Sequence, residues 1–136
     1  GCFWCSWLRR KYLFNIAAEN GIKKVALGHH KDDIIETFLL NLFYHGKLAT
    51  MPNKLKLFDG DLTIIRPLSL VRESDIIRVM KSLELKTYTC LCAHAGVTKR
   101  DYIKNLITEI EKEFKHVRTS IYNATNYEKI DRNYMN

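Results

Sequence analysis

The sequence has no apolar run close to the roughly 20 residues that a membrane-spanning helix needs. Its first residues show no signal-peptide pattern. Glycine and proline are scarce, with six and two residues among 136. Neither common glycine-rich phosphate loop, G-x-G-x-x-G or G-x-x-x-x-G-K-S/T, occurs. We therefore expect a cytoplasmic protein without membrane contact, whose main phosphate cradle, if it uses a nucleotide, lies outside this sequence.

Acidic residues are also few, with 15 Asp and Glu against 22 Lys and Arg, for a formal net charge of +7. The basic residues recur in clusters at Arg9-Arg10-Lys11, Lys23-Lys24, Lys54 and Lys56, and Lys99-Arg100. Clustered positive charge attracts a polyphosphate backbone. A nucleic-acid partner and a generic basic surface explain this charge equally well. With 46% hydrophobic residues, the chain has enough apolar side chains for a core.

The four cysteines form two widely separated pairs, Cys2 with Cys5 and Cys90 with Cys92. Without a secretory signal, thiolate chemistry is a better interpretation than a disulfide framework. A C-x-x-C pair at a helix start suits zinc, an iron–sulfur cluster or a redox dithiol. Four thiolates would close a structural zinc site, whereas three would leave an open coordination position on a reactive centre.

Hydrophobic spacing predicts an alternation of helices and strands. Helices are expected over Cys5–Asn20, from Asp32 or Asp33 to Tyr44, from Arg72 to Leu83, and from Thr98 to Phe114. Strands are expected over Lys23–Leu27 and Lys86–Thr89, and a hairpin over Leu55–Phe58 and Leu62–Ile65 around Asp59-Gly60-Asp61. Cys90–Gly96 is expected to be a loop.

This order favours an α/β fold: part of a doubly wound parallel sheet, with the hairpin as a small insertion. Two main strands are too few for a complete sheet, and a cysteine motif begins at the second residue. We therefore expect a piece of a longer protein, whose N-terminal strands precede this sequence. Residues 1–116 would form the domain, and residues 117–136 a short helix or tail.

The most informative segment is Gly28-His29-His30-Lys31-Asp32-Asp33, which is predicted to lie in a strand-to-helix turn. Open α/β sheets bind ligands at the carboxyl ends of their strands. Gly28 would let the backbone approach a ligand closely, and the oxygens of Asp32 and Asp33 suit Mg²⁺. The alternative interpretation is an ordinary capped helix with a polar first turn.

Several segments together resemble the PP-loop ATPases that thiolate tRNA, in particular the tRNA 2-thiocytidine synthetase group. They are CFWCSWLRR at 2–10, ALGHHKDDIIET at 26–37, FYHGKLATMP at 43–52 followed by Lys54-Leu55, IRPL at 65–68, and CLC at 90–92. The resemblance extends from Gly1 to about Lys115. It implies an adenine nucleotide alpha hydrolase-like fold, with the PP-loop outside this sequence.

The resemblance also implies a reaction. Such enzymes adenylate the C2 oxygen of a cytidine in the tRNA anticodon loop and then replace it with sulfur through a [4Fe–4S] cluster held by three cysteines. ATP and Mg²⁺ would be the other cofactors. Partners would be tRNA and a sulfur donor such as a cysteine desulfurase. A homodimer is a further expectation, although core packing explains the aromatic residues equally well.

Residue by residue, the resemblance assigns roles to eight positions. Asp33 and Asp32 would be catalytic, Arg9, Gly28 and His29 would contact the nucleotide, and Cys2, Cys5 and Cys92 would hold the cluster. Two departures stand out. The family's S-G-G-x-D-S phosphate loop is absent, and Cys-Leu-Cys-Ala replaces the usual wider spacing, so Cys90 remains an alternative ligand. Competing hypotheses are a thiouridine synthetase-like enzyme and a non-catalytic, zinc-stabilised RNA-binding module.

Overall fold

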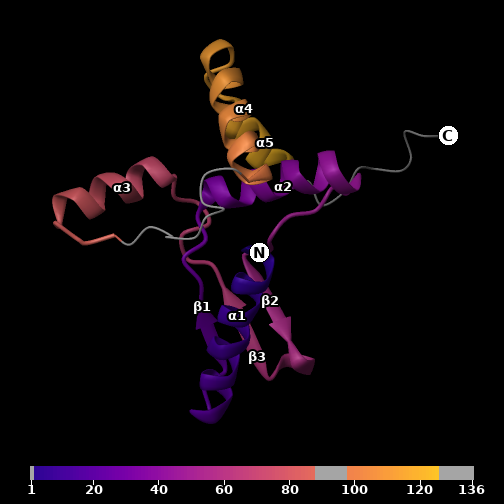
Figure 1. Cartoon of the computed structure of the whole chain (residues 1–136), viewed down its shortest axis with the longest axis vertical. Helices are drawn as coiled ribbons and strands as arrows, with labels where there is room; N and C mark the ends of the chain where they lie inside the picture. Colours follow the sequence, from indigo (N-terminus) through magenta and orange to yellow (C-terminus); the bar gives the residue numbers. More distant parts are fainter. Residues whose placement is uncertain (1, 88–97, 126–136) are drawn as a thin grey trace. The chain divides into compact units, whose positions relative to one another are not determined.

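The computed structural model describes residues 2–87 and 98–125 of the chain (Figure 1). The chain forms two compact units and passes between them three times. The first unit comprises Gly1–His30 and Pro52–Thr98, and the second comprises Lys31–Met51 and Lys99–Asn136. Within the two described ranges, no helix is both long enough and apolar enough to span a bilayer.

The first unit is built on a three-stranded sheet. Its elements are α1 (Cys2–Glu19), β1 (Lys24–Ala26), β2 (Lys54–Leu57), the short 3₁₀ turn η1 (Phe58–Gly60), β3 (Leu62–Ile65) and α3 (Glu73–Ser82). The strand order is β1-β3-β2. β1 runs parallel to β3, whereas β2 runs antiparallel to it.

The core of this unit forms where the carboxyl half of α1 meets the sheet. Ala17 of α1 is buried with Val25 of β1 and Leu62 of β3. Along β3, burial alternates as the pleat requires, and Leu62 and Ile64 point to the buried face. The edge strand β2 instead exposes Lys54 and Lys56, and charged side chains at an edge discourage pairing with other chains.

The predicted hairpin is confirmed, but it is not an insertion beside the sheet. Its second strand, β3, pairs in parallel with β1, with Val25 opposite Ile64. The sheet is therefore mixed, and the expectation of a parallel sheet with a separate hairpin is wrong. The physical reason is that β3 has the alternating buried residues of a central strand, so it pairs with β1 on one side and with β2 on the other.

The expected strand at Lys86–Thr89 is not found in its described half, since Lys86 and Thr87 are exposed and belong to no strand. Its other half, the expected loop at Cys90–Gly96 and the tail after residue 125 lie outside the described residues. The remaining helices are confirmed within a few residues of their predicted ends.

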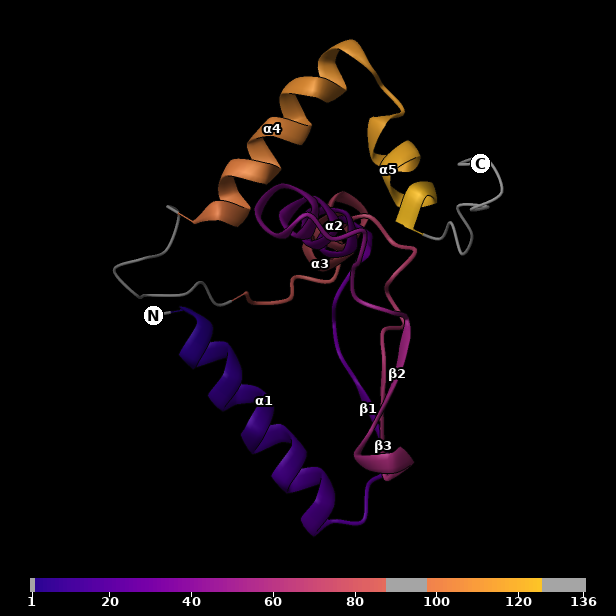
Figure 2. The same ribbon diagram turned by 90° about the vertical axis from the view of Figure 1, so that its right-hand side faces the viewer.

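The second unit consists of α2 (Lys31–His45), α4 (Lys99–Glu113) and α5 (Val117–Thr125). Figure 2 shows α2 end on, with α4 and α5 beside it. The side chains buried between the three helices are Ile34, Ile35, Phe38 and Leu39 of α2, Ile103 and Ile107 of α4, and Tyr122 of α5. Gly46 ends α2 at a φ of 59°, and the Lys47 N–H then donates to the Asn41 carbonyl at 3.1 Å.

Candidate functional site

The carboxyl ends of β1 and β3 place two sequence-predicted segments side by side. Gly28 and His29 follow β1, Arg66 follows β3, and the two strands are parallel neighbours. The Leu27 N–H donates to the Ile65 carbonyl at 2.9 Å, which continues the pairing past both strands. Beyond it, Arg66 Nε donates to His29 Nδ1 at 3.2 Å. α/β folds bind ligands at this end of the sheet, the carboxyl ends of its parallel strands. We call it the carboxyl edge.

Arg66 is held firmly although it is charged. It is 8% exposed, its guanidinium donates to the Pro52 carbonyl, and its backbone N–H donates to the Asn53 carbonyl at 2.9 Å. Burial lowers the pKa of Arg66 below its ordinary value. The guanidinium is therefore a fixed cation beside His29 at this edge.

Gly28 has no structural need to be glycine. Its φ is not in the positive region, and a Cβ built on it would meet no atom of the described residues within 4 Å. The residue is also exposed. The backbone of Gly28 is therefore open to close approach from outside the described residues.

The first turn of α2 carries the predicted carboxylates, which belong to the second unit. Asp32 is 3% exposed, and its Oδ1 accepts from Arg118 of α5 at 2.8 Å. Arg118 also donates to Glu111 Oε2 at 2.8 Å and to Thr108 Oγ1 at 3.2 Å. Burial lowers the pKa of Arg118, but the two carboxylates outweigh that effect and raise it above its ordinary value. Asp32 is thus part of a buried ion-pair network.

Asp33 and Glu36 share a second arginine. Arg100 of α4 donates to Asp33 Oδ1 at 3.2 Å and to Glu36 Oε2 at 3.0 Å. It also reaches Thr37 Oγ1 at 3.2 Å. The Asp33 side chain is 23% exposed, compared with 4% for Asp32. Of the two predicted catalytic aspartates, Asp33 is therefore the more accessible to a ligand.

Glu36 is expected to make stability depend on pH. Burial raises the pKa of Glu36 above its ordinary value of 4.5, and the charge of Arg100 offsets part of that rise. The folded state then binds more protons than the unfolded state above pH 4.5, so stability falls as the pH rises through the raised pKa. Glu36→Gln should flatten this slope in thermal unfolding, whereas the exposed Glu109→Gln should not. An unchanged slope in Glu36→Gln would contradict the assignment.

Helix α1 contains Arg9 and two of the three predicted cluster ligands, Cys2 and Cys5. Cys5 is a free, exposed thiol, and Arg9 is exposed one turn further on. Their i, i+4 spacing places both on one face of the helix. The side chain of Cys2 and both Cys90 and Cys92 lie outside the described part of the chain. Among the residues that are described, no group of three potential metal ligands occurs.

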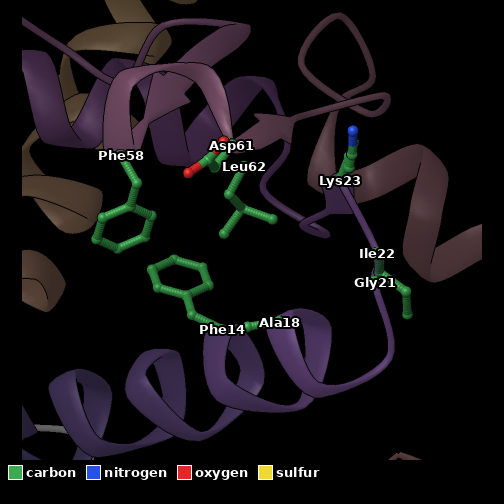
Figure 3. Close-up of a pocket in the computed structure, with 8 residues that line it drawn as sticks. All are labelled: Phe14, Ala18, Gly21, Ile22, Lys23, Phe58, Asp61 and Leu62. Carbon is green, nitrogen blue, oxygen red and sulfur yellow. The ribbon is translucent and has the colours of Figure 1, made fainter.

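A cavity of about 350 Å³ lies at the opposite end of the sheet (Figure 3). Phe14 of α1 and Phe58 of η1 face one another across it, with ring centroids 6.5 Å apart. Its other lining residues are Ala18, Gly21, Ile22, Lys23, Asp61 and Leu62. Because Lys23 precedes β1 and Leu62 begins β3, this is the amino end of both strands. We therefore assign the functional site to the other edge.

Three arginines of these sites were not singled out as site residues from the sequence. Arg66 stands directly after a predicted strand, so its position at the sheet edge was a usable signal. Arg100 appeared only as part of a basic cluster. Arg118 carries no local signal, because its partner Asp32 lies 86 residues away in the chain.

Comparison with known proteins shows the family to which the chain belongs. The sequence profile of a family described as the PP-loop domain matches residues 7–111. The chain belongs to the PP-loop domain family. The sequence resemblance to PP-loop proteins is thereby confirmed, and the matched residues include the small mixed sheet of the first unit.

Curated relatives of this chain include proteins named tRNA-cytidine(32) 2-sulfurtransferase. The one from Burkholderia multivorans is 44% identical over 124 residues, 90% of this chain and 38% of the relative. The one from Burkholderia vietnamiensis is 46% identical over 114 residues, 83% of this chain and 34% of the relative. The chain thus spans little more than a third of the length of these relatives.

A solved structure shares the fold. It is the U34-tRNA thiolase NcsA from Methanococcus maripaludis with its [4Fe-4S] cluster, 22% identical, with a TM-score of 0.74. The match covers 93% of this chain and 43% of NcsA. At this identity the likeness concerns the PP-loop fold alone.

Proposed function

We propose that this chain is part of an ATP-dependent tRNA sulfurtransferase that adenylates the C2 oxygen of an anticodon-loop cytidine and then introduces sulfur. The observation that carries the proposal is the 44% identity to tRNA-cytidine(32) 2-sulfurtransferases across 90% of the chain. The formal charge of +7 supports a tRNA partner. A cysteine desulfurase as sulfur donor, a homodimer and a cytoplasmic location belong to the same proposal.

We propose that the nucleotide binds at the carboxyl edge of β1 and β3. Gly28 gives the ligand close access, His29 and Arg66 supply polar groups, and Arg9 supplies a cation from α1. The family's S-G-G-x-D-S loop is absent from the sequence, so we propose that another segment supplies the phosphate cradle. A positive charge at this edge would offset charge on the transferring phosphate.

Asp33 is the better candidate for a catalytic carboxylate, because Asp32 is buried against Arg118. Both aspartates are ion-paired with arginine, so the described residues offer Mg²⁺ only a partial ligand set. Of the two, Asp33 would bind Mg²⁺. Asp32 would instead hold the start of α2 in place through its ion pair with Arg118.

We propose that Cys2, Cys5 and Cys92, with Cys90 as the alternative third ligand, hold a [4Fe–4S] cluster. The described part of this set fits, because Cys5 is exposed, free and one turn from Cys2 along α1. Thiolates are the usual ligands of such clusters. A bound cluster would supply the open iron position for sulfur transfer.

The test starts with anaerobic purification and analysis for iron, sulfide and zinc. The chain is then incubated with unmodified tRNA, ATP and sulfide, and the nucleosides are identified by mass spectrometry. Iron with sulfide, and ATP-dependent 2-thiocytidine, would support the proposal. A 2-thiouridine product would instead indicate a thiouridine synthetase. Stoichiometric zinc without iron would replace the proposal with an RNA-binding module.

The variant Gly28→Ala is expected to change ATP affinity without changing the stability of the fold. We expect an unchanged melting temperature, because the added methyl meets no atom of the described residues. We expect ATP affinity to be about tenfold lower, because the methyl blocks close approach of the ligand. The measurement is calorimetric titration with ATP of the protein that also contains the segment with the phosphate cradle. The matched control is Gly46→Ala, at a φ of 59°, which should cost about 1 kcal/mol of stability and leave ATP affinity unchanged. Unchanged affinity in Gly28→Ala would contradict the assigned edge.

A further inference from the structure

We propose that Arg66 is a positioning residue that holds His29 in the neutral tautomer protonated on Nε2, which makes His29 a hydrogen-bond donor to the nucleotide. The donor role rests on the nucleotide site proposed above, whereas the tautomer itself follows from geometry alone.

The geometry fixes which atom gives the proton. Arg66 Nε carries a hydrogen and has no acceptor capacity, so at 3.2 Å from His29 Nδ1 it can only donate. A ring nitrogen that accepts a hydrogen bond carries no proton. The neutral imidazole has one N–H, which must then be on Nε2.

Arg66 is able to impose this choice because it has little freedom to move. It is 8% exposed, and its NH1 donates to the Pro52 carbonyl. The guanidinium is planar, so a bond from NH1 also fixes the direction of Nε–H. The backbone N–H of Arg66 is tied to the Asn53 carbonyl at 2.9 Å, which fixes the base of the side chain just after β3.

The tautomer decides what His29 can do at the carboxyl edge. An Nε2–H group suits an anionic oxygen, such as a phosphate oxygen, and the neighbouring guanidinium adds favourable positive charge. In this state Nε2 cannot accept a proton as a base. Nδ1 is engaged with Arg66 and is not available as a metal ligand. His29 is therefore suited to hold a phosphate and not to remove a proton from the substrate.

The tautomer is tested first, in the full chain without nucleotide. The chain is labelled with ¹⁵N in its five histidines and in arginine, His29 is assigned with the variant His29→Gln, and the ring nitrogens are observed at mildly alkaline pH. We expect an unprotonated Nδ1, a protonated Nε2, and a coupling through the hydrogen bond between Arg66 Nε and His29 Nδ1. Arg66→Met should shift the balance between the tautomers.

Two results would overturn the tautomer proposal: a protonated Nδ1 in the unmodified chain, or an unchanged tautomer in a folded Arg66→Met variant. If Arg66→Met does not fold, the through-bond coupling in the unmodified chain decides the question, because its absence at high signal quality contradicts the hydrogen bond.

The donor role is tested by ATP titration of two variants, each in the protein that also contains the segment with the phosphate cradle. Glutamine places an N–H near the position of Nε2, whereas asparagine reproduces only the Nδ1 position. We expect His29→Asn to weaken ATP binding about tenfold or more, as loss of one hydrogen bond to a charged group would. His29→Gln should lose clearly less, and the exposed control His116→Asn should lose nothing. Equal losses in the two His29 variants would overturn the donor role.

These experiments also separate the inference from the proposed function. If the chain joined to the segment that carries the phosphate cradle binds no ATP while His29 shows the Nε2–H tautomer, the nucleotide site fails and the positioning by Arg66 stands. If ATP binds and His29 carries its proton on Nδ1, the nucleotide site stands and the inference fails.

Discussion

Cys5→Ala is expected to abolish iron and sulfide binding by the anaerobically purified chain while leaving helix α1 intact. Cys5 is exposed and free, and alanine is the best helix former, so stability should change by less than about 0.5 kcal/mol. A cluster held by three thiolates loses a third of its protein ligands in this variant. The measurement is iron and sulfide analysis together with the visible absorption spectrum.

Variants at the other cysteines sharpen this test. Ser6→Ala is the matched control, because it changes the neighbouring residue of the same helix and should retain the iron. Cys2→Ala should behave like Cys5→Ala. Comparison of Cys90→Ala with Cys92→Ala identifies the third ligand, which we expect to be Cys92. Iron retained in full by Cys5→Ala would contradict the proposed ligand set.

Arg118→Ala is expected to destabilise the second unit by about 3–5 kcal/mol, the cost of breaking a buried ion pair by removing one partner. Asp32, 3% exposed, would lose its guanidinium partner. Glu111 would lose a bond of 2.8 Å at the same time. Amide hydrogen exchange in α2 and α5 should accelerate on the order of a hundredfold or more, as the corresponding change in opening free energy requires.

Two comparisons show whether the cost comes from the stranded charge. Arg78→Ala removes an exposed arginine, with a 79% exposed side chain that pairs with Asp75 at 3.5 Å, and should cost at most about 0.5 kcal/mol. The double variant Asp32→Asn with Arg118→Ala should recover part of the loss, because Asp32→Asn removes the buried negative charge that Arg118 offsets. Strictly additive losses would show that Asp32 and Arg118 are not coupled.

The sequence predicted the helices and the hairpin well because their signals are local. Ile34, Ile35 and Phe38 show the spacing of a buried helix face, and Asp59-Gly60 marks the hairpin turn. The parallel partner of β1 was harder to predict. The short strand β3 could be assigned from its alternating pattern. Nothing in its residues indicates that its second side pairs with β1, whose first residue, Lys24, lies 38 positions before Leu62.

The candidate site likewise contains residues that a local pattern predicts and partners that it does not. Gly28, His29 and Asp33 belong to a segment whose pattern is visible in the sequence, and the resemblance assigned them roles. Their arginine partners come from distant segments, since Arg66 is 37 residues from His29 and Arg100 is 67 from Asp33. The sequence pattern predicted the residues of the strand-to-helix turn. It did not predict Arg66 and Arg100 as their partners, because these contacts form only when distant segments fold together.

The interleaving of the two units has a consequence for synthesis on the ribosome. Each unit takes one segment from before residue 52 and one from after it. Helix α2 is complete long before α4 and α5, whose residues Ile103, Ile107 and Tyr122 cover its apolar side chains. The nascent chain must therefore carry that apolar surface without its final cover until translation has passed residue 122, and a chaperone would have its longest opportunity to bind there.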